Sequence, residues 1–63
     1  MLKIREIRKA KGMTLADLAI AVGTTSATIC RYERGIRNPS ISMAFKLAAA
    51  LGVTVDELIG KAG

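Results

Sequence analysis

Apolar residues recur at helical spacing through most of this 63-residue chain, and the pattern breaks at glycines. Its centre holds two apolar stripes on either side of Gly23, formed by Leu18, Ala19, Val22, Ile29 and Tyr32. Because glycine adopts positive φ without the steric cost of a Cβ atom, one helix can end abruptly at Gly23. Thr25 offers a hydroxyl cap to the next helix. Residues 14–34 are therefore predicted to form two helices joined by a tight turn.

The boundaries of this central pair carry their own signals. Thr14 and Asp17 are spaced to form a capping box at the start of the first of its helices. The second helix is expected to cover about residues 26–34, with Gly35 ending it and Pro39 blocking any continuation. Two helices joined in this way are a helix-turn-helix, whose second helix usually enters the major groove of DNA.

Similar signals define three further helices. One is predicted from residue 2 to about residue 11 and another over residues 41–51. A short last helix follows, opened by a capping box of Thr54 and Glu57. No strand alternation or repeat interrupts the series, so residues 1–63 are predicted to form one all-α domain of five helices.

The predicted core is aliphatic, because the chain has one tyrosine, one phenylalanine and no tryptophan. Its expected members are Ile4, Ile7, Met13, Leu18, Ala19, Val22, Ile29, Tyr32, Ile41, Ala44, Leu47, Ala48, Leu51, Val53, Val55 and Leu58. Cys30 is interpreted as a small, half-packed helix residue. A single cysteine cannot form an internal disulfide, which favours a reducing cytoplasmic location. No apolar run is long enough to span a membrane, and no signal-peptide pattern is present, so no membrane association is expected.

The composition also argues against catalysis. The chain has no histidine, and its one cysteine has no base beside it. Zinc would therefore lack its preferred ligands, and no glycine-rich phosphate loop is present. We expect no enzyme activity, no metal, no cofactor and no small-molecule substrate.

The positive charge is concentrated in the first part of the chain. The entire net charge of +5 lies at or before Arg37, because the later lysines and acidic residues cancel. A one-sided basic field around the helix-turn-helix indicates a polyanionic partner.

Three ordered segments resemble the Cro and repressor type of helix-turn-helix protein. They are IREIRKAKGMT, DLAIAVGTTSATICRYERGIRNPS and LAAALGVTVDELIG, which follow the family's pattern in order and without gaps. The resemblance runs over nearly all of the chain. The resemblance implies a five-helix, lambda-repressor-like fold with the second and third helices as the DNA-reading unit. It also implies that Arg8 pairs with Glu33 and so links the first helix to the end of the third.

The resemblance assigns DNA contacts to two groups of residues. Base contacts fall to Ser26, Ala27, Thr28 and Arg31, in and beyond the first turn of the third helix. Phosphate contacts fall to Thr14, Thr25, Arg34, Arg37 and Asn38. The chain departs from the family at Leu15, where a glutamine usually bonds the DNA backbone.

These features predict a sequence-specific double-stranded DNA-binding regulator, a repressor that binds a two-fold operator as a homodimer. Val55 and Ile59 are candidate dimer contacts. The alternative is a protein-interaction module, such as an antitoxin or adaptor. That alternative depends on an apolar exterior of the second helix, where Leu15, Ile20 and Ala21 replace polar residues of relatives.

Overall fold

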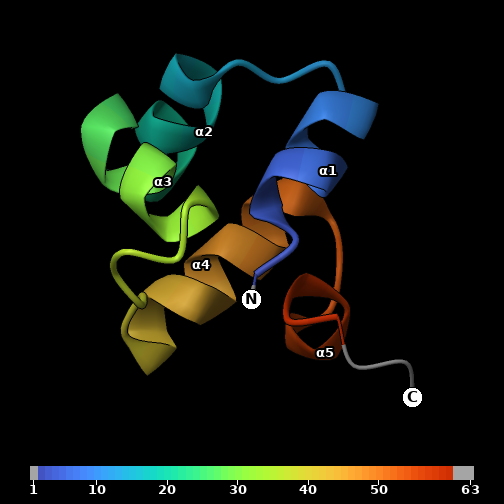
Figure 1. The fold of residues 1–63 in the computed structure, drawn as a ribbon. Coiled ribbons are helices and arrows are strands. Elements are labelled where there is room, and N and C mark those ends of the chain that lie inside the picture. The colour runs from blue at the N-terminus through green and yellow to red at the C-terminus, as the bar shows by residue number, and fades with distance from the viewer. Residues whose placement is uncertain (1, 61–63) are drawn as a thin grey trace.

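The computed structural model describes residues 2–60, which contain five α-helices in the predicted order (Figure 1). They are α1 (Ile4–Ala10), α2 (Leu15–Val22), α3 (Ser26–Glu33), α4 (Ile41–Leu51) and α5 (Val55–Leu58). The described residues contain no strand. The all-α prediction is confirmed, and the expected helix limits differ from the observed ones by at most two residues.

Hydroxyl side chains start four of the helices. The side-chain oxygens of Thr14, Thr25, Ser40 and Thr54 each accept the backbone N–H three residues later, at 3.0–3.2 Å. At α2 and α5 an acidic side chain bonds back to the cap residue, which completes both predicted capping boxes. Such caps satisfy N–H groups that have no partner inside the helix, at about 1 kcal/mol each.

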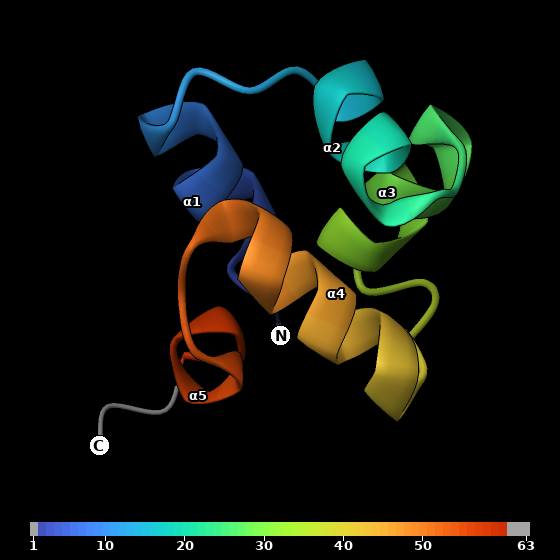
Figure 2. The ribbon, with the colours of Figure 1, turned by 180° about the vertical axis from the view of Figure 1, so that it is seen from behind.

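The helices enclose one small core. Helix α2 packs against α3 and α4, α1 contacts the same two helices, and α5 lies against α4 (Figures 1 and 2). A hydrogen bond of 2.8 Å from the Lys3 N–H to the Leu58 carbonyl ties the start of α1 to α5. The buried apolar residues are Ile4, Leu18, Ala19, Val22, Ile29, Tyr32, Leu47, Ala48, Leu51 and Leu58.

Most of the predicted core is confirmed, with one error. Ile7, Met13, Val53 and Val55 are partly buried and pack against the central cluster, and Ala44 is half-buried. Ile41 matches the spacing of the core stripe, but its side chain is 80% exposed. The prediction fails because Ile41 is the first residue of α4, whose first turn projects beyond the other helices (Figure 2).

Within residues 2–60, every helix is too short or too polar to cross a lipid bilayer.

Candidate nucleic-acid interface

A sharp turn sets the angle between α2 and α3. Gly23 has φ of 76°, in the left-handed region, and the Thr24 N–H donates to the Ala19 carbonyl at 2.9 Å. The turn is closed at its other end by Thr25, whose hydroxyl oxygen accepts the Thr28 N–H at 3.2 Å. The helix-turn-helix predicted over residues 14–34 is therefore present, with its two helices in direct contact.

One side of α3 is buried and the other is open. Ile29 and Tyr32 enter the core, whereas Ala27 and Arg31 are exposed and Ser26 is half-exposed. Ala27 and Arg31 are four residues apart and so lie on the same face of the helix. The structure thus brings three of the four residues predicted to contact bases to the exposed surface without a competing side-chain bond.

The fourth residue, Thr28, is already engaged. Its hydroxyl lies 3.0 Å from the hydroxyl of Thr25, and each group can donate to the other. Thr25 therefore uses its oxygen for helix capping and for this contact at once. Both hydroxyl groups therefore already have a hydrogen-bond partner, although each has capacity for a second one.

Thr14, a predicted phosphate contact, already forms hydrogen bonds within its own helix start. The Thr14 N–H donates to the Asp17 carboxylate at 3.0 Å, and its hydroxyl oxygen accepts the Asp17 N–H at 3.0 Å. Hydrogen bonds from the backbone and side chain of Thr14 hold the pKa of Asp17 below its ordinary value. An anion approaching this helix start meets a carboxylate that already occupies the positive end of α2.

The remaining predicted phosphate contacts gather after α3. Arg34, Arg37 and Asn38 are all exposed. The loop that carries them folds back on the helix, because the Ile36 N–H donates to the Arg31 carbonyl at 3.0 Å. The backbone of Arg34 and Arg37 is thereby held close to the C-terminal end of α3.

Arg8 and Glu33 meet between α1 and α3. The Arg8 Nε donates to Glu33 Oε2 at 2.8 Å, Nη2 lies 3.4 Å from Oε1, and Nη1 donates to the Met13 carbonyl at 2.7 Å. Less than a tenth of either side chain is exposed. The ion pair that the resemblance implied is present, and it joins two helices that are far apart in sequence.

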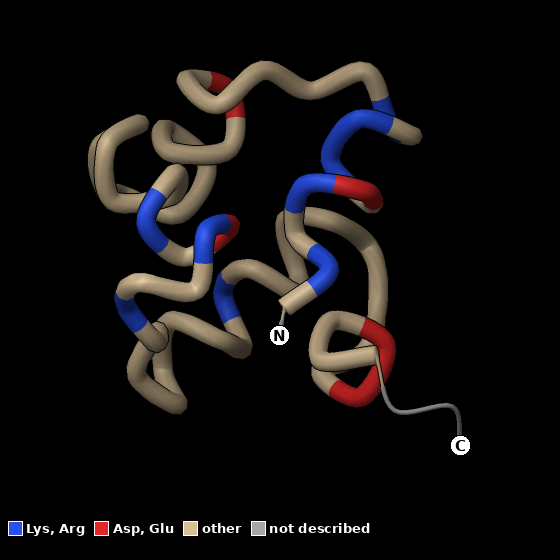
Figure 3. Tube along the Cα trace, in the orientation of Figure 1, with Lys and Arg blue, Asp and Glu red and all other residues tan. Residues whose placement is uncertain are grey.

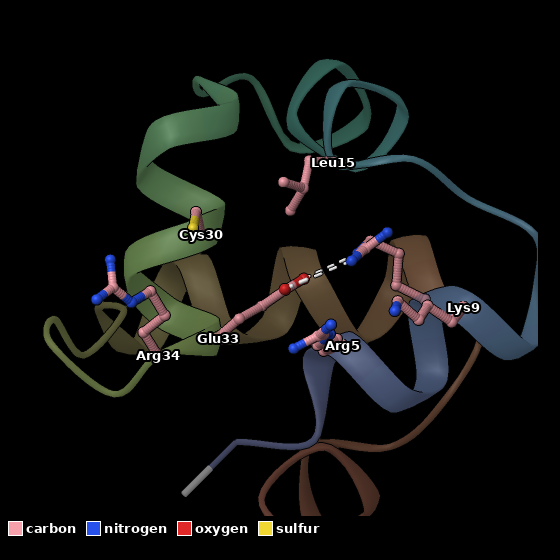
Figure 4. A pocket seen from close by; sticks show the side chains of 7 residues that line it. Arg5, Lys9, Leu15, Cys30, Glu33 and Arg34 are labelled. Atoms are coloured by element: carbon pink, nitrogen blue, oxygen red, sulfur yellow. Dashed lines mark hydrogen bonds and ion pairs between the residues drawn. The ribbon is translucent and has the colours of Figure 1, made fainter.

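Sequence reasoning missed an open pocket beside this ion pair. We call it the notch. It has a volume of about 400 Å³ between α1, α2 and α3, and its lining residues are Arg5, Arg8, Lys9, Leu15, Cys30, Glu33 and Arg34 (Figure 4). The spacing of Arg5, Arg8 and Lys9 was the available signal, since i, i+3 and i+4 share one helix face.

The basic residues follow the elements around α3. Lysines and arginines lie on α1, at the end of α3 and on the loop after it, whereas the short α5 carries acidic residues (Figure 3). Basic residues thus lie on α3 itself and on the segments before and after the helix-turn-helix, with Lys46 on α4 as a further one.

The expected apolar exterior of α2 is only partly present. Ile20 is 80% exposed and Ala21 is exposed, but Leu15 is half-buried and packs against the core. Placing Leu15 on the exterior was wrong, because its spacing from Leu18 and Val22 puts it on the core stripe of the same helix. The apolar exterior of α2 therefore consists of Ile20 and its small neighbours Ala16 and Ala21.

Comparisons with known proteins agree with this geometry. Residues 4–58 match the model of the family described as helix-turn-helix. The fold is similar to the P22 c2 repressor protein, whose crystal structure contains a synthetic operator. The TM-score is 0.89 at 28% identity, and the match covers 95% of this chain and 91% of the repressor chain.

Two relatives are named as a putative HTH-type transcriptional regulatory protein and an uncharacterized HTH-type transcriptional regulator. The protein from Archaeoglobus fulgidus is 39% identical over 56 residues, which are 89% of this chain and 80% of the relative. The protein from Aeropyrum pernix is 42% identical over 57 residues, which are 90% of this chain. This chain spans 17% of the length of that larger relative. By its turn, its exposed third helix and these matches, the chain belongs to the helix-turn-helix family of transcriptional regulators.

Proposed function

We propose that this protein is a sequence-specific double-stranded DNA-binding regulator, a repressor, that inserts α3 into the major groove. The observation that carries this proposal is the exposed face of α3 with cations beside it. Ala27 and Arg31 lie on that face, and Arg34 and Arg37 follow it. The similar P22 c2 repressor was solved with a synthetic operator, which supports the same role here.

Sequence would be read by the first two turns of α3. Arg31 can donate two parallel hydrogen bonds to guanine, worth about 1–3 kcal/mol against a wrong base. Ser26 can donate or accept, whereas Ala27 offers a methyl group suited to the methyl of thymine. Thr28 would contribute only by turning its hydroxyl away from Thr25.

Phosphate contacts would hold the protein in register without reading sequence. Arg34 and Arg37 supply exposed cations, and Asn38 supplies an amide in the same loop. Thr14 and Thr25 would act through hydroxyl groups that are already hydrogen-bonded. We therefore expect the loop arginines to contribute more of the salt-sensitive affinity than the threonines do.

A homodimer fits the dimensions of the molecule. One helix in the groove touches only a few base pairs, so two copies are needed for a selective site. Adjacent half-sites lie roughly 34 Å apart, and the longest dimension of this domain is 30 Å. Two copies side by side would present their α3 helices to one face of the duplex. Val55, the half-buried first residue of α5, and Ile59, the exposed residue that follows the helix, are the proposed contacts.

Selection of bound duplexes from a random pool tests this function. The proposal expects one enriched sequence with two inverted half-sites about one helical turn apart. Arg31→Ala should relax the preference at one base pair in each half-site. Arg34→Ala, the matched control, should lower affinity for all sequences and flatten its salt dependence while leaving the preference intact. The absence of any enriched sequence, with the protein folded, would contradict the proposal.

A further inference from the structure

The notch holds more positive charge than its own contacts neutralise. Arg8 is fully used by Glu33 and the Met13 carbonyl. The Arg8–Glu33 pair is the only ion pair within residues 2–60. Arg5, Lys9 and Arg34 therefore line the notch without a carboxylate partner among the described residues. Three cations around one opening repel each other, and a bound anion would relieve that repulsion.

The notch opens beside the face of α3 that is proposed to read bases. Cys30 and Arg34 line the notch, and they lie three and seven residues after Ala27. That spacing places them on the same helix face as Ala27 and Arg31. In Figure 4, Arg5 and Lys9 extend from α1 toward this side of α3.

Groove dimensions bring a DNA strand to this position. An α-helix with its side chains is about 10–12 Å across, and the major groove is about 12 Å wide. A helix that fills the groove has a sugar-phosphate strand along each side. The strand on the α1 side of α3 would pass over the notch.

We propose that the notch binds one backbone phosphate of the duplex in each half-site, held by Arg5 and Lys9 of α1 together with Arg34 of α3. This inference rests on the function proposed above. It makes α1 a part of the DNA-binding surface, with Arg5 and Lys9 as phosphate ligands. It also accounts for Leu15, which lines the notch but cannot donate a hydrogen bond, because α1 supplies the donors instead.

Glu33 does not oppose this role. Its side chain is only 8% exposed, and its carboxylate accepts a hydrogen bond from the Arg8 guanidinium. The Arg8–Glu33 ion pair lines the notch and joins α1 to α3. A phosphate at the opening would therefore meet the three unpaired cations.

The first test compares charge removal inside and outside the notch. The Arg5→Gln/Lys9→Gln double variant is measured beside Lys11→Gln, whose ammonium lies against Gly52 at the end of α4, outside the notch lining. Binding to the selected duplex is titrated over a range of salt concentrations, with circular dichroism confirming that each variant is folded. The slope of log affinity against log salt should fall by about 1 or more in the double variant, and by less in Lys11→Gln. Affinity at moderate salt should fall about tenfold in the double variant.

The second test identifies the phosphate. Single methylphosphonate groups, which are neutral, replace one phosphate at a time along the selected duplex. One position in each half-site should weaken binding by the wild type about tenfold. The same replacement should weaken binding by the double variant, which keeps only Arg34 at the notch, by clearly less. That coupling would assign the notch to a DNA phosphate.

The outcomes separate the two proposals. If the wild type binds no duplex, the proposed function fails and the notch inference fails with it. If the wild type binds but the double variant matches Lys11→Gln and no phosphate position is coupled, the notch inference is overturned while the function stands. Nuclear magnetic resonance shifts at Arg5 and Lys9 caused by inorganic phosphate, without any coupled DNA position, would also overturn it.

Discussion

Removing one partner of the Arg8–Glu33 pair should cost much more stability than removing both. Arg8→Met would take the cation away from Glu33, whose side chain is only 8% exposed in the wild type. It would also remove the donor to the Met13 carbonyl. Breaking a buried pair from one side costs about 3–5 kcal/mol. A domain of this size has a total free energy of unfolding of roughly 3–9 kcal/mol. If the wild type lies at the low end of that range, the single variant should be largely unfolded.

The double variant Arg8→Met/Glu33→Leu should recover most of that loss. With both charges gone, the main remaining cost is the Met13 carbonyl, at about 1–2 kcal/mol. The assay is a double-mutant cycle, with unfolding by urea followed by circular dichroism at low temperature. An osmolyte present in every sample keeps the single variants folded enough to measure. The reasoning would be refuted if the double variant lost as much stability as the two single variants lose in sum, because the two side chains would then act independently.

Three other predictions follow from single residues. Gly23→Ala should destabilise the fold by about 1–2 kcal/mol, measured by thermal unfolding, because φ is 76° although the space around the glycine is free; a neutral result would mean that the turn rearranges. The pKa of Asp17 is held below its ordinary value of 3.8 by Thr14, so its stabilising effect is present above that pH and is lost as the pH falls below it. Asp17→Asn should therefore show less acid destabilisation than the wild type as the pH falls below 3.8, in melting temperatures measured at each pH; equal losses would exclude the capping box as the cause. Leu15→Gln should place a hydrogen-bond donor in the notch and strengthen duplex binding roughly two- to tenfold in a direct titration, and unchanged affinity would indicate that no phosphate comes within reach.

Local signals explain how much of the fold could be predicted from sequence. Helix starts were readable because Thr14, Thr25 and Thr54 bond to groups only three residues away. The start of α4 carries the same local signal, because the Ser40 hydroxyl oxygen accepts the Met43 N–H. Gly23 was equally clear, because its conformation depends on the turn itself.

The errors arose where a side chain depends on distant parts of the chain. Ile41 has the spacing of a core residue, but no neighbouring helix extends far enough to cover it. Leu15 was assigned to the surface from the polar residue usual at that position, against its own spacing on the helix. The notch required knowledge of how closely α1 and α3 approach, which no local pattern contains. Of the candidate site, exposure of α3 could be predicted, while the joining of Arg5 and Lys9 to Arg34 could not.

Three of the four residues proposed to read bases have side chains that no hydrogen bond ties to the rest of the described structure. Within residues 2–60, the side chains of Ser26, Ala27 and Arg31 make no hydrogen bond, while the buried side of α3 holds the helix in place. Exchanges at such positions usually change stability by no more than about 0.5 kcal/mol. New target preferences could thus be acquired in small mutational steps, each of which leaves a folded protein for selection to act on.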